Sequence, residues 1–273
     1  NIDGEVVIGE GERDEAPMLY IGEKVGTGKG PKVDIALDPL EGTTLTAKGM
    51  PNALAVVAMA QGGSLLNAPD VYMEKIAIGG GYPAGLVDLD ADPADNVKAL
   101  AKAKGVDVEL INVCVLDRPR HAEIIAKVRE VGARVTLITD GDIAGVIHCT
   151  DPATGIDMYM GTGGAPEGVL AAAGLRCTGG QMQGRLVTDS EEQKARAAKM
   201  GITDFSKKYK MEEMASGDVV LSVTGVTAGS MLSGIERRGD EVWTDTVLMR
   251  SSTGTIRWIK ARHSHIDKFN IDD

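Results

Sequence analysis

The feature that most constrains this chain is a polar turn, residues 38–44 (Asp-Pro-Leu-Glu-Gly-Thr-Thr), that follows a mostly apolar run, Val33–Leu37. The run is typical of a buried strand, and Pro39 is expected to end its hydrogen-bond ladder because proline has no N–H to donate. Asp38 and Glu41 then lie on a rigid turn beside a glycine and two hydroxyl groups. Such carboxylates suit a hard divalent cation that holds a phosphate on its far side. The alternative is an ordinary surface turn, because Asp, Pro and Gly are common turn residues.

A second group of polar residues follows the strands of an expected strand–helix–strand unit. Residues 109–116 and 133–139 are apolar runs, and residues 120–131 between them show helical spacing up to Gly132. A unit of this length is expected to be parallel. Ligands of open α/β sheets bind at the carboxyl ends of the strands, so the polar residues that follow them should share one rim. These residues are Arg118, Pro119, Arg120, Asp140, Gly141 and Asp142.

The chemistry of this rim suits a phosphorylated sugar. Arg118 and Arg120 suit bidentate binding of phosphate, and Asp140 and Asp142 suit sugar hydroxyl groups. A solvated helix start is the alternative for the arginines. Two cations at a helix N-terminus oppose the helix dipole, however, and local inconsistencies of this kind tend to mark functional sites.

A third motif is the glycine-rich turn of residues 161–168, which precedes an apolar helix at residues 169–175. Pro166 suits the first helical position, and Glu167 suits the first turn, where the dipole favours a carboxylate. The turn lacks the GxGxxG spacing of dinucleotide-binding folds, which argues against a Rossmann dehydrogenase. A capped helix start with nothing bound is the alternative.

Composition limits the classes of partner. The chain has 273 residues, 43% hydrophobic and 25% charged, which is ordinary for a globular protein with a sizeable core. Its formal net charge of −11 argues against nucleic acid and anionic membranes as partners. The three cysteines lack metal-ligand spacing and indicate reduced thiols in a cytoplasmic protein.

Taken together, the motifs resemble the bacterial class II fructose-1,6-bisphosphatases of the lithium-sensitive phosphatase superfamily, and the likeness runs from Asp3 to about Arg262. The segments that carry it are residues 9–12, 14–19, 38–44, 67–75, 118–121, 140–142 and 163–168. The resemblance implies a layered α-β-α-β-α fold with mixed sheets. It also suggests an N-terminal metal-binding part at residues 1–95 and a C-terminal substrate-binding part at residues 96–273. The strands within residues 215–265 would join one of these two parts.

The resemblance also implies roles for individual residues. The ligands of Mg²⁺ or Mn²⁺ would be Glu10, Asp38, Glu41 and Glu167, with a further acidic ligand in a segment ahead of Asn1. Thr43 would position the attacking water, and Asp14 would receive its proton. The substrate-binding residues would be Glu41, Gly42, Thr43, Tyr72, Arg118, Pro119, Arg120, Asp140, Gly141, Asp142 and Gly164.

The leading hypothesis is therefore a metal-dependent phosphatase that removes the 1-phosphate of fructose 1,6-bisphosphate. An enzyme that also accepts sedoheptulose 1,7-bisphosphate is a close alternative. An inositol monophosphatase is less favoured, because a monophosphate does not need the rim of Arg118 and Arg120. A sugar-phosphate sensor without catalytic activity is the alternative from another class. The resemblance further implies a homodimer or homotetramer.

Overall fold

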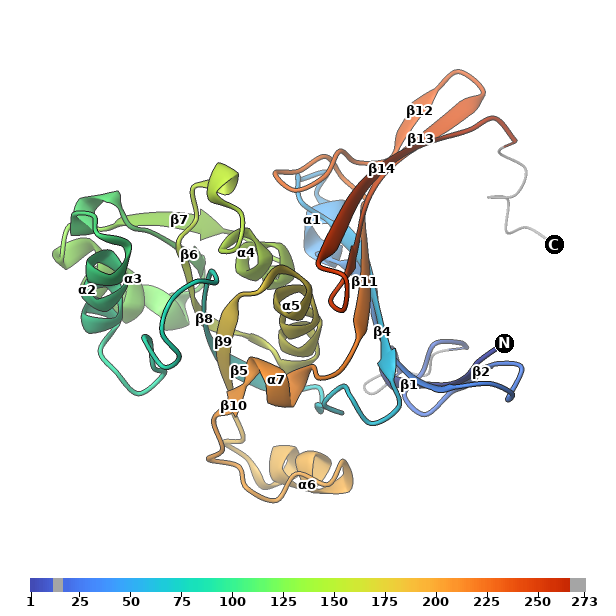
Figure 1. Cartoon of the computed structure of the whole chain (residues 1–273), viewed down its shortest axis with the longest axis horizontal. Coiled ribbons are helices and arrows are strands. Elements are labelled where there is room, and N and C mark those ends of the chain that lie inside the picture. Colours follow the sequence, from blue (N-terminus) through green and yellow to red (C-terminus); the bar gives the residue numbers. More distant parts are fainter. Residues whose placement is uncertain (12–16, 266–273) are drawn as a thin grey trace.

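The structure is a computed structural model that describes residues 1–11 and 17–265. Within these residues the strands form two sheets, which we call the large and the small sheet (Figure 1). The large sheet has the order β12 (Glu236–Arg238), β13 (Glu241–Arg250), β11 (Val219–Gly225), β4 (Leu54–Gln61), β3 (Lys32–Glu41), β1 (Asp3–Ile8) and β2 (Lys24–Gly26), and β14 (Thr255–His263) pairs with β13. Only β1 and β3 run parallel in it; its other pairs are antiparallel.

The small sheet has the order β10 (Tyr209–Lys210), β9 (Gln181–Leu186), β5 (Tyr72–Ile78), β8 (Met158–Gly164), β6 (Asn112–Leu116) and β7 (Arg134–Ile138). Strands β6, β7 and β8 run parallel to one another, while β5, β9 and β10 pair antiparallel. The prediction of a parallel β6–β7 unit is therefore confirmed, and so is the prediction of an α/β fold with mixed sheets. The division of the chain near residue 95 stays a prediction.

Helices separate and cover the sheets (Figure 1). Helices α2 (Pro93–Lys104) and α3 (Ala122–Glu130) pack together beside the small sheet, whereas α4 (Asp142–His148) and α5 (Ala165–Thr178) lie between the two sheets. Helix α5 contacts β3, β4, β11 and β13 of the large sheet and β5, β8 and β9 of the small one. The other α-helices of the described residues are α1 (Thr43–Ala47), α6 (Glu191–Lys199) and α7 (Met211–Met214). In the part of the chain that the structure describes, no helix is long and apolar enough to cross a bilayer.

The chain between β1 and β3 differs from expectation. From the sequence alone, residues 14–25 favour a weakly helical stretch; residues 14–16 lie outside the described residues, and residues 17–23 form bends and turns. Leu19 and Gly22 have φ angles of 61° and 90°, which a right-handed helix does not contain. Lys24–Gly26 then pairs with β1 as a strand. The helix prediction is wrong because these residues complete the edge of a sheet.

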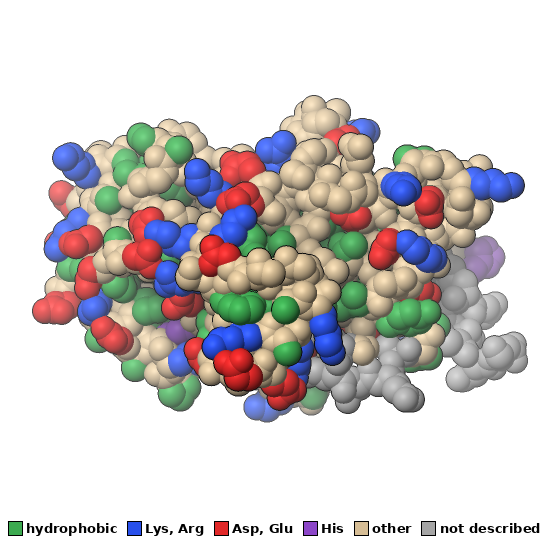
Figure 2. Space-filling model, turned by 90° about the horizontal axis from the view of Figure 1, so that it is seen from below, with side chains coloured by type: hydrophobic (Ala, Val, Ile, Leu, Met, Phe, Trp, Pro, Cys, Tyr) green, Lys and Arg blue, Asp and Glu red, His purple; other side chains and the backbone are tan. Residues whose placement is uncertain are grey.

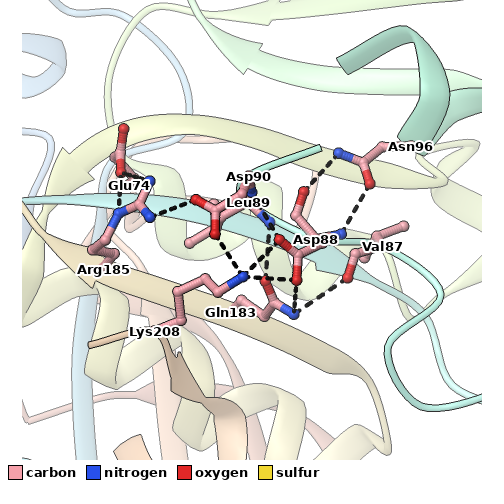
Figure 3. Close-up of polar contacts among 9 residues, drawn as sticks. All are labelled: Glu74, Val87, Asp88, Leu89, Asp90, Asn96, Gln183, Arg185 and Lys208. Atoms are coloured by element: carbon pink, nitrogen blue, oxygen red, sulfur yellow. Dashed lines mark hydrogen bonds and ion pairs between the residues drawn. The ribbon is translucent and has the colours of Figure 1, made fainter. Parts of the chain in front are cut away.

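A network of polar side chains fixes the long segment that follows β5 (Figure 3). Lys208 forms ion pairs with Asp88 and Asp90 at 2.7 Å each, and Arg185 pairs with Asp90 and with Glu74. The segment before α2 is thereby tied to β9 and to the residues around β10. Elsewhere on the surface, acidic and basic side chains alternate over the face shown in Figure 2.

Candidate active site

The polar turn of residues 38–44 does not end the strand as expected. Strand β3 continues to Glu41, but its pairing with β4 shifts between Asp38 and Glu41, so Pro39 and Leu40 form a bulge. Proline cannot donate to the ladder, and a bulge is one of the places where a sheet accepts it. The side chain of Asp38 accepts a hydrogen bond of 3.0 Å from the N–H of Leu40, which fixes the carboxylate against the bulge.

Glu41 is held at the start of α4. Its side chain is buried, and its Oε1 accepts a 3.0 Å hydrogen bond from the N–H of Ile143. Gly141 makes this approach possible, because it has a φ of 69° and a Cβ at that position would lie 3.4 Å from the Glu41 carboxyl group. Gly42, with a φ of 86°, then turns the chain from β3 into α1, which begins at Thr43.

Glu167 lies in the first turn of α5, where the helix dipole favours a carboxylate. Pro166 precedes it in that turn, as the sequence predicts. The carboxyl group folds back onto Gly164, where an added Cβ would overlap it. Gly164 therefore gives Glu167 the space to point away from the helix.

These loops surround one cavity of about 680 Å³. Its walls include Glu10, which follows β1, and acidic residues of β3, α4 and α5, together with the arginines that follow β6. The predicted site residues that line it are Glu10, Asp38, Glu41, Gly42, Thr43, Tyr72, Arg118, Arg120, Asp140, Gly141, Asp142, Gly164 and Glu167. Pro119 does not line it, and Asp14 lies outside the described residues. The two motifs that the sequence placed on separate loops thus share one cavity.

The arginine rim is ordered by contacts within the chain. Arg120 donates hydrogen bonds of 3.1 and 2.7 Å to the carbonyl oxygen of Thr162, and its guanidinium lies 4.7 Å from the centre of the Tyr72 ring. Arg118 donates to the carbonyl oxygen of Thr139 at 2.5 Å and pairs with Asp140 at 3.3 Å. A guanidinium has five N–H donors, so each arginine keeps donors for a ligand. The tyrosine and both arginines can therefore face one anion.

Four acidic side chains that line the cavity have the chemistry of a cation site. We call them the acidic wall: Glu10, Asp38, Glu41 and Glu167. Two of its oxygens are buried without a hydrogen-bond partner among the described residues: Oε2 of Glu41 and Oε2 of Glu167. Buried carboxylate oxygens require a partner, and an oxygen-only set suits Mg²⁺ or Mn²⁺. The residues present therefore fit a hard divalent cation. Within residues 1–11 and 17–265, however, no three acidic or imidazole side chains already converge as a coordination shell.

The pKa values of these carboxyl groups show how unfavourable their charges are without a cation. Burial, with repulsion from Glu10 and Asp140, raises the pKa of Asp38 to about 6. Burial raises the pKa of Glu167 to about 7, although the nearby Lys75 acts in the opposite direction. The pKa of Glu41 is raised well above its usual value by burial and by Asp142. A bound cation would relieve this repulsion and draw the carboxylates together.

Sequence reasoning missed three buried side chains behind the cavity. Lys75 of β5 and Tyr159 of β8 both contact the carboxylate of Asp142, and His121 bridges the arginine rim to β8. The sequence signal for Lys75 is a lysine directly before the apolar residues Ile76–Ile78, at the end of the resemblance segment 67–75, and no role was assigned to it. Asp70 also lines the cavity and received no role.

Comparison with known proteins agrees with this geometry. The family model described as "Bacterial fructose-1,6-bisphosphatase, glpX-encoded" matches residues 1–263. The chain is 47% identical over 277 aligned positions to fructose-1,6-bisphosphatase 1 class 2 of Escherichia coli strain K12, covering 96% of this chain and 82% of that protein. Fructose-1,6-bisphosphatase class 2 of Shigella flexneri is similar to the same extent, 47%. The chain therefore belongs to the family of bacterial class II fructose-1,6-bisphosphatases.

Proposed function

We propose that this chain hydrolyses the 1-phosphate of fructose 1,6-bisphosphate to give fructose 6-phosphate and phosphate, as its family membership implies. The observation that carries the proposal is that the acidic wall lines the same cavity as Arg118, Arg120 and Tyr72. The substrate carries an anionic phosphate at each end, and a protein with a net charge of −11 repels it. Local positive charge is therefore needed to hold both phosphates.

In this proposal the acidic wall would hold Mg²⁺ or Mn²⁺ through Glu10, Asp38, Glu41 and Glu167. When bound, the cation supplies charge neutralisation for the phosphate and lowers the pKa of a water molecule. The hydroxyl of Thr43 orients the attacking water, and the N–H groups of Gly42 and Thr43 hold the phosphoryl oxygens in the transition state. Asp14 receives the proton of that water.

Other residues that line the cavity bind the rest of the substrate. Arg118, Arg120 and Tyr72 hold the phosphate that is not cleaved, since arginine matches phosphate geometry and a phenol donates one further hydrogen bond. Asp140 and Asp142 accept hydrogen bonds from the sugar hydroxyl groups, beside the backbone of Gly141 and Gly164. We further propose a homodimer or homotetramer in the cytoplasm.

The proposal is tested by measuring phosphate release from fructose 1,6-bisphosphate with Mn²⁺, with Mg²⁺ and with a chelator. We expect the chelator and Asp38→Asn to abolish turnover, because the acidic wall no longer holds the cation. Thr43→Ala should lower kcat by about 10²-fold or more while KM changes little, since its hydroxyl acts on the water and not on the substrate.

Parallel assays decide between substrates. Sedoheptulose 1,7-bisphosphate tests the wider specificity, and inositol monophosphate tests the related activity of the superfamily. Faster release from inositol monophosphate than from fructose 1,6-bisphosphate would overturn the proposal. Tight binding of fructose 1,6-bisphosphate without any metal-dependent turnover would instead indicate a sensor.

A further inference from the structure

Behind the acidic wall lies a fully buried lysine that the proposed reaction does not use. The side chain of Lys75 has 0% exposure, and its Nζ lies 2.5 Å from Oδ2 of Asp142, whose side chain is 2% exposed. The hydroxyl of Tyr159, also buried, donates to the same oxygen at 2.9 Å. Two donors therefore bind one oxygen of Asp142, and the other oxygen, Oδ1, is left without a partner among the described residues.

The backbone around Lys75 is shaped to admit it. The lysine leaves β5 and passes between Gly163 of β8 and Gly168 of α5, where added Cβ atoms would lie 3.2 Å from its Nζ and 3.5 Å from its Cε. A Cβ on Gly163 would also overlap the carboxylate of Asp142. Gly163 thus leaves the space that Asp142 and the end of Lys75 occupy, whereas a Cβ on Gly168 would make only an ordinary van der Waals contact with the lysine.

Such a buried ion pair is not explained by stability. Removing two charges from water costs several kcal/mol per ion, and apolar residues of similar volume commonly stabilise a core at least as well. Local inconsistencies of this kind tend to occur at functional sites. Asp142 lines the cavity and is one of the residues to which we assign a sugar hydroxyl.

We propose that Lys75 and Tyr159 are positioning residues that fix the carboxylate of Asp142, so that its free Oδ1 accepts a hydrogen bond from a hydroxyl group of the sugar. This inference rests on the proposed function for the identity of the sugar. Because Oδ2 is bound twice on its inner side, the carboxylate cannot rotate without breaking an ion pair and a hydrogen bond. The lysine thereby acts on affinity for the sugar through Asp142.

The test uses four variants of the full chain. Lys75→Met removes the charge and keeps the aliphatic length, Tyr159→Phe removes only the hydroxyl, and Asp142→Asn removes the acceptor charge. The double variant Lys75→Met with Asp142→Asn removes both charges of the pair, so neither partner is left as an unpaired buried ion. Lys104→Met is the control, because Lys104 forms an ion pair with Asp157 and neither residue lines the cavity.

We measure kcat and KM for fructose 1,6-bisphosphate, and the binding of fructose 6-phosphate and of inorganic phosphate by calorimetry. Lys75→Met should raise KM and weaken fructose 6-phosphate about 10- to 100-fold, the loss expected when one ordered hydrogen bond to a charged group disappears. Binding of inorganic phosphate should stay within about twofold of wild type by the same argument. Tyr159→Phe should show the same pattern with a smaller loss, and Lys104→Met should show none.

The double variant separates positioning from folding. Circular dichroism and thermal unfolding report whether each variant folds, and Tyr159→Phe and the double variant carry the test if Lys75→Met does not. A double variant that folds yet binds fructose 6-phosphate weakly supports the proposal. One that regains wild-type affinity, or a folded Lys75→Met with wild-type KM, overturns it. Absence of turnover by the wild type rejects the proposed function alone, and the calorimetry still decides the role of Lys75.

Discussion

At the scale of single residues, His121 holds the arginine rim and the glycine-rich turn in register. Its Nδ1 lies 2.7 Å from the carbonyl oxygen of Leu116, and its Nε2 lies 2.8 Å from the backbone nitrogen of Thr162. Because the N–H of Thr162 can only donate, Nε2 must accept and Nδ1–H must donate, which fixes a neutral tautomer. Arg120 donates a hydrogen bond to the carbonyl oxygen of the same Thr162, so both backbone groups of this β8 residue are bound by side chains.

This arrangement predicts a pH-dependent effect of His121→Gln. Burial, together with Arg120 and Arg118, lowers the pKa of His121, although its bond to Leu116 acts in the opposite direction. The unfolded chain therefore takes up a proton near pH 6.5 while the folded chain resists it, so this contribution to stability is present above about pH 6.5 and lost below it. The variant should be less stable than wild type by about 1–3 kcal/mol at pH 8, and the difference should shrink at pH 5.5.

Urea unfolding at the two pH values checks this prediction. His265→Gln is the control, since His265 is exposed and its replacement should change stability at neither pH. A difference between wild type and His121→Gln that grows on acidification would contradict the assigned tautomer.

The site residues of the loops were predictable, whereas the buried residues behind them were not. Asp38 and Glu41 lie near the end of a strand and Glu167 lies in the first turn of a helix, so their position in the motif also gives their position at a sheet edge. Lys75 and His121 lie among apolar or basic neighbours in sequence, and their partners are distant in the chain. Asp142 is 67 residues from Lys75, and no local pattern joins them.

At the scale of elements, Asn96 connects α2 to the segment that precedes it. Its side chain is only 4% exposed, and it both accepts from the N–H of Asp88 and donates to the carbonyl oxygen of Asp88, each at 2.9 Å. The ion pairs of Lys208 and Arg185 hold the same segment from the other side (Figure 3). Asn96 therefore holds this segment through buried hydrogen bonds, and the two basic residues hold it through ion pairs.

We expect Asn96→Ala to destabilise the fold by about 2 kcal/mol, because two hydrogen bonds are lost and both backbone groups of Asp88 lose their side-chain partner. Hydrogen exchange should rise first in residues 79–92 and leave β3 and β4 protected. Lys98→Ala on the exposed side of α2 is the matched control and should change stability by less than about 0.5 kcal/mol. An equal rise in hydrogen exchange over the whole chain would show that the hydrogen bonds of Asn96 do not stabilise this segment selectively.

Elements with a clear period or a clear stop were predictable from sequence. The hairpin of β13 and β14 turns near Gly254, as the alternating pattern and the glycine indicate. Strand β9 was missed because Gln181, Gln183 and Arg185 make it polar, although they form hydrogen bonds to the segment before α2 and its neighbours. Helix α4 was missed because it starts inside a motif that we interpreted as a ligand-binding loop.

At the scale of the whole molecule, the repulsion within the acidic wall opposes folding. Divalent cations should therefore raise the midpoint of thermal unfolding, and the gain should be larger at pH 8 than at pH 5.5. The reason is that Asp38, with a pKa of about 6, and Glu167, with a pKa of about 7, bind protons at pH 5.5 and compete with the cation.

Scanning calorimetry with Mn²⁺, with Mg²⁺ and with a chelator measures this gain. Glu41→Gln should reduce it at pH 8, since one of the assigned ligands loses its charge. Glu109→Gln, on the short turn before β6 and away from the cavity, should keep the full gain. Equal gains at both pH values would argue that the cation binds elsewhere.

Helix α5 contacts both sheets, and Glu167 lies in its first turn. The position of the Glu167 carboxylate therefore depends on how the two sheets are aligned. A small shift of one sheet relative to the other, too small to open the core, would already move the Glu167 carboxylate away from Asp38 and Glu41. On gentle warming, turnover should fade before any spectroscopic sign of melting, and cooling should bring it back.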